Sequence, residues 1–260
     1  MDQQFLQGRN LLQQVRNVQD ETERVTSILE GNGQLGVRAP QMLERLGDGL
    51  SLLAQIASCA WGCRETDHTI ENLVRRFSNA ATAALRLAYL GQYDEAIALI
   101  RVMGELANLL QLFAMNSEHL DRWRSVSDKE RIAEYGPVGV RLKLEALKAT
   151  PILDHKSYNK LCELGVHVTP ASAFTSHDIE GTRVYVGSQL SVPAFLMVLS
   201  ELVYLTAQVL PHCGEITGRE EDRLRSLREC RDTLLKTLSW LRVTNYERVM
   251  AHFRKGQQPP

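Results

Sequence analysis

Residues 192–210, VPAFLMVLSELVYLTAQVL, are the best candidate for a membrane-spanning segment in this chain, and they limit the folds open to it. A proline in the second position suits the first turn of a helix, and Pro211 is expected to end that helix. The stretch is long enough to cross a membrane, but it contains Glu201 and Gln208, which hydrocarbon would not solvate. We therefore interpret it as the central core helix of a protein that makes no membrane contact.

Apolar residues recur with a helical period along most of the chain. This pattern predicts helices over about 2–30, 40–62, 69–90, 94–114, 137–149 and 154–164, a short helix after the capping-box sequence SDKE (127–130), and a basic C-terminal helix that begins at TGRE (217–220). The fold class is therefore all-α, a bundle of about eight helices.

One stretch departs from this period. Residues 166–189 contain TRVYV between Gly181 and Gly187, which predicts a small irregular or hairpin segment near 166–190. No long linker divides the chain. We expect an N-terminal helical extension over 1–36, one bundle domain over 37–254 and a disordered tail over 255–260.

The first helix carries an apolar seam that needs a cover, from this chain or from a second copy. Its members recur, together with Thr22, at steps of three and four residues: Leu11, Val15, Val18, Val25 and Leu29. The seam is one basis for expecting a homodimer.

Composition is that of an ordinary globular protein, with 44% apolar and 23% charged residues and a net charge of −1. Such a charge creates no global field that attracts nucleic acid or anionic membrane. The five cysteines have no framework spacing, so we expect reduced thiols in a cytoplasmic protein. The N-terminus, MDQQFLQGRN, lacks the pattern of a secretory signal.

The segment LIRVMGELANLL (99–110) carries three polar residues on one helical stripe, Arg101, Glu105 and Asn108. They are either the solvated edge of a mostly buried helix or a functional set. An arginine held by a carboxylate and an amide is suited to present its planar guanidinium to an anion. Arginine preceding glutamate by four residues is the weaker arrangement for helix stability, which favours the functional interpretation.

His167 is a second candidate, because it follows a predicted helix end at Gly165 and precedes Pro170. A histidine there can act as a general acid or base, or it can simply be satisfied by the helix C-terminus. Cys59, Cys63 and His68 form a candidate metal set without an evident fourth ligand. We interpret the two cysteines as buried thiols on one helix face, and we expect no metal and no cofactor.

The segments ALRLAYLGQYDEAIALIRVMGELANLL and YNKLCELGVHVTP resemble bacterial helical proteins of unknown function that are similar to the HEPN superfamily (higher eukaryotes and prokaryotes nucleotide-binding domains). The resemblance covers roughly residues 70–210. The matching positions are Arg101, Glu105, Asn108, Tyr158, Leu161 and His167. It implies an all-α bundle, frequent dimerisation and, in some members, metal-independent RNA cleavage in defence or toxin systems.

The resemblance implies tentative catalytic roles for Arg101 and His167 and ligand-binding roles for Glu105, Asn108 and Tyr158. The sequence departs from active HEPN nucleases, which have four to six residues between an arginine and the histidine that follows it. Arg64 and His68 have only three residues between them, as do Arg248 and His252. We therefore expect a groove that binds RNA or a nucleotide rather than cleaves it. If the protein is an enzyme, it is a metal-independent ribonuclease.

The alternative is a non-catalytic structural or protein-interaction module. In that case the N-terminal seam and the C-terminal helix would bind a partner. Residues 223–255 hold nine Lys or Arg against three Asp or Glu, a balance that also suits docking on an acidic bundle or contact with RNA.

Overall fold

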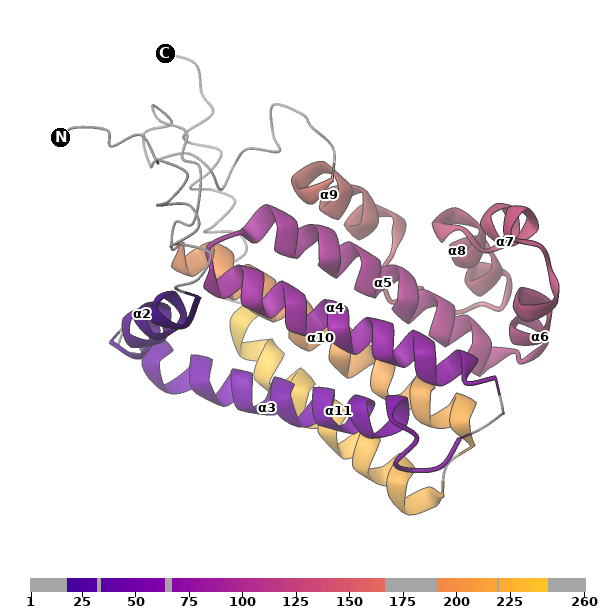
Figure 1. Cartoon of the computed structure of the whole chain (residues 1–260), viewed down its shortest axis with the longest axis horizontal. Helices are drawn as coiled ribbons and strands as arrows, with labels where there is room; N and C mark the ends of the chain where they lie inside the picture. The colour runs from indigo at the N-terminus through magenta and orange to yellow at the C-terminus, as the bar shows by residue number, and fades with distance from the viewer. Residues whose placement is uncertain (1–17, 32–33, 64–66, 167–190, 219, 243–260) are drawn as a thin grey trace, which may run out of the picture.

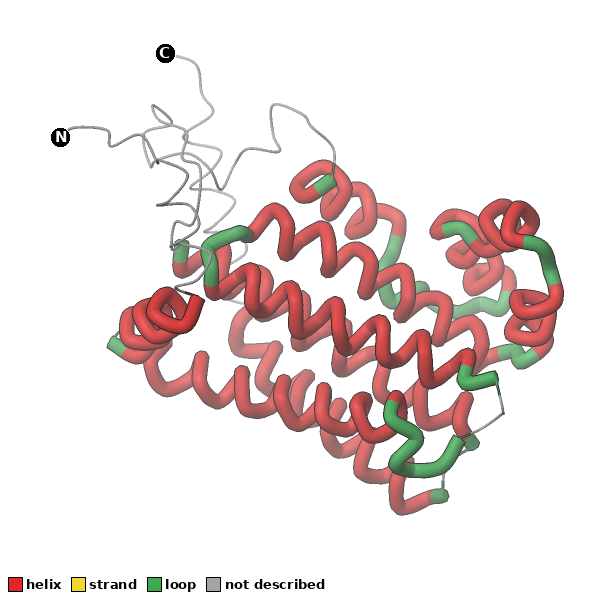
Figure 2. Tube along the Cα trace, viewed as in Figure 1, coloured by secondary structure: helices red, strands yellow, loops and turns green. Residues whose placement is uncertain are grey.

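A computed structural model of the chain describes residues 18–31, 34–63, 67–166, 191–218 and 220–242. Every regular element in these ranges is a helix, which confirms the all-α prediction (Figures 1 and 2). The ten helices are α2 (Val18–Glu30), α3 (Gln34–Ala57), α4 (Thr69–Tyr89), α5 (Tyr93–Met115), α6 (Glu118–Ser125), α7 (Asp128–Tyr135), α8 (Pro137–Ala146), α9 (His155–Gly165), α10 (Val192–Thr217) and α11 (Glu221–Arg242).

The long helices form a two-layered bundle (Figure 1). Helices α3, α4 and α5 lie side by side, and α10 and α11 lie behind them. Helix α10 packs against α3, α4, α5 and α11, so it is central as the sequence predicts. Helix α9 lies on α5, and the short helices α6, α7 and α8 gather near one end of α5.

Two helices, α5 and α10, are long and apolar enough to cross a membrane by composition alone. In each, 67% of the most apolar window is buried inside the bundle. Helix α10 contributes fully buried residues over more than half of its circumference, such as Ala194, Phe195 and Leu196. A helix with so wide an apolar surface is stable in a soluble protein when neighbouring helices cover that surface.

Helix α10 does not end at Pro211, as the sequence predicts, but continues to Thr217. Cys213 and Ile216 extend its buried face beyond the proline, and this packing outweighs the loss of one backbone hydrogen bond. The Thr217 hydroxyl donates to the Cys213 carbonyl within α10, so TGRE is not a capping box. Helix α11 begins only at Glu221.

Other helix boundaries agree with the local sequence signals at some positions and differ from them at others. The capping box of Ser127 and Glu130 is present, and Pro137 opens α8, both as predicted. Pro40, expected near a helix start, lies inside α3, which begins at Gln34. Helix α6 is an addition in the charged region where the sequence predicts no helix before residue 127.

Helix α2 packs against α3 and α4, and Val25 of the predicted seam is 1% exposed within the core. This chain therefore covers part of the seam itself. Leu11 and Val15 lie outside the described residues, as do residues 167–190, which include nearly all of the expected hairpin segment. The homodimer stays a prediction.

Replacing glycine by alanine should have opposite effects on stability at two positions. A Cβ at Gly165 would lie 2.7 Å from the Asp94 carbonyl oxygen and 2.9 Å from the Ala98 nitrogen, both in the backbone of α5. Gly165→Ala should therefore lower the free energy of unfolding by about 1–3 kcal/mol, because α9 must move away from α5. Gly47→Ala, where a Cβ meets nothing within 4 Å, should raise it by about 0.5–1 kcal/mol. Urea unfolding of both variants tests this, and equal effects would contradict the close packing of α9 on α5.

Candidate anion-binding site

Arg101 and Glu105 lie on the one stripe of α5 that is not fully buried. The Arg101 Nη1 donates to the Glu105 carboxylate at 2.5 Å and to the Tyr158 hydroxyl of α9 at 3.2 Å. The two charged side chains are 23% and 26% exposed, so they are neither a solvated edge nor a fully buried pair. The Nε of Arg101 is buried and has no hydrogen-bond partner among the described residues. A bound water or anion is the usual partner of such a donor.

Arg141 of α8 also contacts Tyr158. Its guanidinium carbon lies 4.7 Å from the centroid of the Tyr158 ring, a cation–π contact, and the residue is 5% exposed. Within the part of the chain that the structure describes, Arg141 makes no hydrogen bond and no ion pair. A nearly buried charge without a counter-ion is costly unless something supplies one.

The sequence did not single out Arg141, although a signal was present. Pro137, Val140, Arg141 and Leu144 have the spacing of an amphipathic stripe, with arginine at one of the apolar positions. Val140 and Leu144 are indeed buried with it. An arginine on the apolar stripe of a short helix has to find an acceptor, an aromatic face or a ligand.

Burial and the nearby charges set the protonation states of Glu105 and Tyr158. Burial raises the pKa of Glu105, and the charges of Arg101, Arg141 and Arg76 offset that effect only in part. Burial likewise raises the pKa of Tyr158, against the hydrogen bond from Arg101, so the phenol is neutral at physiological pH. One carboxylate therefore faces three guanidinium groups. We call Arg76, Arg101, Arg141, Glu105 and Tyr158 the arginine cluster.

A small cavity of about 170 Å³ adjoins the cluster through Arg76 and Glu105. Its other walls are mostly apolar side chains of α5 and α8 with Tyr135 of α7. A water occupies about 30 Å³ of liquid, so this space suits a few waters or one small oxyanion and not a whole nucleotide. A longer ligand would have to lie across the surface.

Asn108 has a different role from the one that the family resemblance implies. It is 3% exposed, its amide nitrogen donates to the Leu153 carbonyl at 2.9 Å, and its oxygen accepts from the Leu153 N–H at 2.9 Å. One turn along, Gln111 bonds the Thr150 carbonyl and the Ile152 N–H in the same way. Both amides hold the non-helical segment 150–153 against α5, so Asn108 is not available to a ligand.

The structure brings Arg101, Glu105 and Tyr158 together, as expected of a shared site. His167 lies outside the described residues, so its predicted partnership with Arg101 stays a prediction. Helix α9 does end at Gly165, where the sequence placed a helix end.

A larger cavity, about 400 Å³, is an open groove between α3 and α11 and contains none of the predicted site residues. Its charged lining includes Arg45, which pairs with Asp48 at 3.3 Å, and Glu229. Burial raises the pKa of its one thiol, Cys230, to about 11, so that thiol is protonated at neutral pH and is a poor nucleophile. Nothing in this groove defines a reaction.

Comparison of the chain with protein-family models, with curated proteins and with solved structures finds no match.

Asn108→Ala should lower the free energy of unfolding by about 2–4 kcal/mol, because it leaves the Leu153 N–H and carbonyl buried without partners. Asn79→Ala on the exposed face of α4 is the matched control and should change it by less than about 0.5 kcal/mol. Chemical denaturation of the two variants measures both values. A loss below about 1 kcal/mol for Asn108→Ala would mean that water replaces the amide and reaches the backbone of segment 150–153.

Arg101→Ala should destabilise the protein in a pH-dependent way. Without Arg101 the pKa of Glu105, already raised by burial, should rise further. An acid whose pKa is higher in the folded state loses stability as pH increases from its unfolded pKa through its folded pKa. The free energy of unfolding of the variant should therefore be closest to that of the wild type in acid. Near neutrality it should be about 1–3 kcal/mol lower, a smaller loss than a fully buried ion pair would cause.

Thermal melts of Arg101→Ala across this pH range measure the effect. The double variant Arg101→Ala/Glu105→Gln removes the titrating group and should abolish the added pH dependence. The same pH profile in the single and double variants would show that Glu105 is not the source.

Proposed function

We propose that the protein binds a phosphorylated ligand, RNA or a nucleotide, through the arginine cluster. The observation that carries this proposal is Arg141, a residue that is 5% exposed and forms no ion pair among the described residues. Together with Arg76 and Arg101 it outnumbers the single carboxylate of Glu105. A phosphate dianion would supply the missing negative charge and accept from the unpartnered Nε of Arg101.

Two physical features favour phosphate over other anions. The guanidinium fork matches the geometry of phosphate oxygens, and three such groups exceed what one carboxylate ligand needs. The neutral Tyr158 hydroxyl can donate to a phosphate oxygen, and its ring already supports two guanidinium groups, at 4.7 Å and 5.9 Å. The small cavity is lined by Arg76 and Glu105 but not by Arg101, Arg141 or Tyr158. A phosphate held by the cluster would therefore lie beside this cavity rather than inside it.

Binding without cleavage requires fewer functional groups than RNA cleavage does, so it is the function that we propose. Arg101 Nη1 is held by Glu105 and Tyr158, which suits positioning of an anion. Cleavage would also require a group that transfers protons, for which His167 is the candidate. If purified protein cleaves RNA, the His167→Ala variant should lose that activity while chelators leave it unchanged.

The experiment compares the wild type with Arg141→Met, which keeps the apolar part of the side chain. Because Arg141 has no ion pair to break, this variant should fold with unchanged or higher stability. Its affinity for inorganic phosphate, mononucleotides and single-stranded RNA should fall about 10- to 100-fold, as expected for one charge-assisted contact. Its RNA affinity should depend on salt with a slope smaller by about one unit. Calorimetry and fluorescence anisotropy at low salt measure both.

Arg225→Ala on α11 is the matched control, since it removes one exposed arginine that pairs with Asp222 and lies on a helix that packs on α3 and α10. It should bind phosphate and RNA like the wild type. Loss of RNA binding in Arg225→Ala alone would move the RNA site to the basic C-terminal helix. No binding of any of these ligands by the wild type would refute the proposal.

A second candidate, a protein-interaction module, is favoured by an exposed apolar patch on α7 and α8. Ile132 is 76% exposed, and Val138 and Leu142 are each 60% exposed one helical turn apart. If this patch joins two copies, Val138→Glu/Leu142→Glu should convert a dimer to a monomer in light scattering without loss of helix content. A wild type that is monomeric at high micromolar concentration would exclude it.

A further inference from the structure

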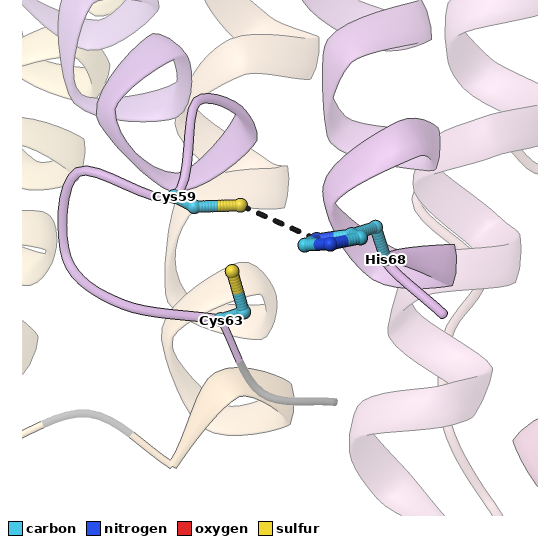
Figure 3. A group of neighbouring side chains, drawn as sticks. All are labelled: Cys59, Cys63 and His68. Carbon is cyan, nitrogen blue, oxygen red and sulfur yellow. Dashed lines mark hydrogen bonds between the residues drawn. The ribbon is translucent and has the colours of Figure 1, made fainter. Parts of the chain in front are cut away.

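The turn between α3 and α4 gathers three side chains that favour soft metal ions: Cys59, Cys63 and His68 (Figure 3). Their ligand atoms all lie within 4.8 Å of one another. The Cys59 side chain points toward the imidazole, and the Cys63 side chain points toward the Cys59 sulfur. The sequence-based interpretation of two buried thiols on one helix face is wrong. Helix α3 ends at Ala57, both cysteines lie in the turn beyond it, Cys59 is half-buried and Cys63 is exposed.

One separation among these atoms is close to the edge of a coordination tetrahedron. With Zn–S near 2.3 Å and Zn–N near 2.0 Å, two ligand atoms of a tetrahedral zinc lie about 3.6–3.8 Å apart. The Cys59 Sγ lies 3.4 Å from the His68 Nδ1, close to one such edge. The same distance also fits a thiol–imidazole hydrogen bond, but that bond needs only two of the three groups and gives Cys63 no role.

The first half of the turn is anchored to other parts of the bundle. Arg223 of α11 donates to the Trp61 carbonyl at 2.8 Å, and its guanidinium lies 5.4 Å from the centroid of the Trp61 ring. The Trp61 indole nitrogen donates to the Gln55 side chain of α3 at 2.6 Å. Trp61 stands midway between the two cysteines, so these contacts fix the backbone that carries both sulfurs.

The second half of the turn is held just before α4. Asp67 accepts from the backbone and hydroxyl of Thr69 and forms an ion pair with Arg124 at 3.1 Å. Among the described non-glycine residues only Cys59, His68 and Lys148 have left-handed backbone, and two of these three belong to the cluster. Such backbone persists where the surrounding structure fixes it, and it is common at functional sites.

We propose that Cys59, Cys63 and His68 form a binding site for zinc or a metal ion of similar softness. The two thiolates and the neutral imidazole would supply three of four tetrahedral ligands, with water in the fourth position. Binding of Zn²⁺ forms two Zn–S bonds and one Zn–N bond, and it releases the two thiol protons to solvent, so the Zn(Cys)₂(His) unit is electrically neutral. The site is independent of the arginine cluster.

A metal bound here would link the end of α3 to the start of α4. The three ligands lie within ten residues and on both sides of residues 64–66, so coordination closes a short loop. Binding to the folded form alone stabilises a protein by an amount that grows with the logarithm of the free metal concentration once this exceeds the Kd. We therefore expect the metal to raise the melting temperature.

The test uses the full chain, stripped of metal by a chelator and kept reduced with a phosphine. Titration with Co²⁺ should give the thiolate charge-transfer and intense visible bands of a tetrahedral site, saturating at one ion per chain. Excess Zn²⁺ should displace the Co²⁺, and Zn²⁺ should raise the melting temperature. Cys63→Ser and His68→Asn should each weaken Zn²⁺ binding at least 100-fold in competition with a chromogenic chelator. Both substitutions are mild, since Cys63 is exposed and asparagine tolerates the left-handed backbone at residue 68.

Cys230→Ser and His155→Asn remove one thiol and one imidazole outside the turn and should bind Zn²⁺ like the wild type. Three results would overturn the proposal: no Zn²⁺ binding by the folded wild type at micromolar concentration, the weak spectrum of octahedral Co²⁺, or undiminished affinity in Cys63→Ser and His68→Asn. Equal loss in the control variants would also overturn it, because the metal would then be binding to scattered surface groups.

Discussion

Helix α5 has to be buried on nearly every side, and much of the bundle serves that requirement. Helices α4 and α10 cover two of its faces, and α8 and α9 cover others. The segment 150–153 also lies against it without helical hydrogen bonds of its own. Without hydrogen-bond partners, the backbone N–H and carbonyl groups of this segment would be costly in an apolar core. Asn108 and Gln111 remove that cost by binding the Thr150, Ile152 and Leu153 backbone.

The same burial shapes the candidate site. The stripe of α5 that carries Arg101 and Glu105 is covered only in part, by Tyr158 of α9 and Arg141 of α8. In water an ion pair of this kind contributes little, but partial burial raises the pKa of Glu105 and makes each partner depend on the other. Arg141 adds a charge that forms no ion pair with a described residue. The fold thus concentrates positive charge in one place although the chain as a whole is nearly neutral.

Sequence patterns predicted most where the chemistry is local. The capping box at Ser127 and Glu130 and the helix start at Pro137 depend only on neighbouring residues, and both are present. The helix boundaries predicted at Pro40 and Pro211 are wrong. A proline marks the end of a helix only if no packing outweighs the lost hydrogen bond. Arg101, Glu105 and Tyr158 were predicted to share a site, whereas Arg141 was missed because its role depends on which helix faces it.

By itself the sequence determined the helical class, the central place of α10 and the arginine–glutamate pair on α5, because periodicity and spacing act within one helix. Only the tertiary structure decided that Asn108 serves the fold, that Arg141 stands beside Tyr158, and that Cys59, Cys63 and His68 meet at one turn. These outcomes depend on which segments lie side by side. A side chain's spacing along the chain does not contain that information, since packing between distant elements sets its burial and its partners.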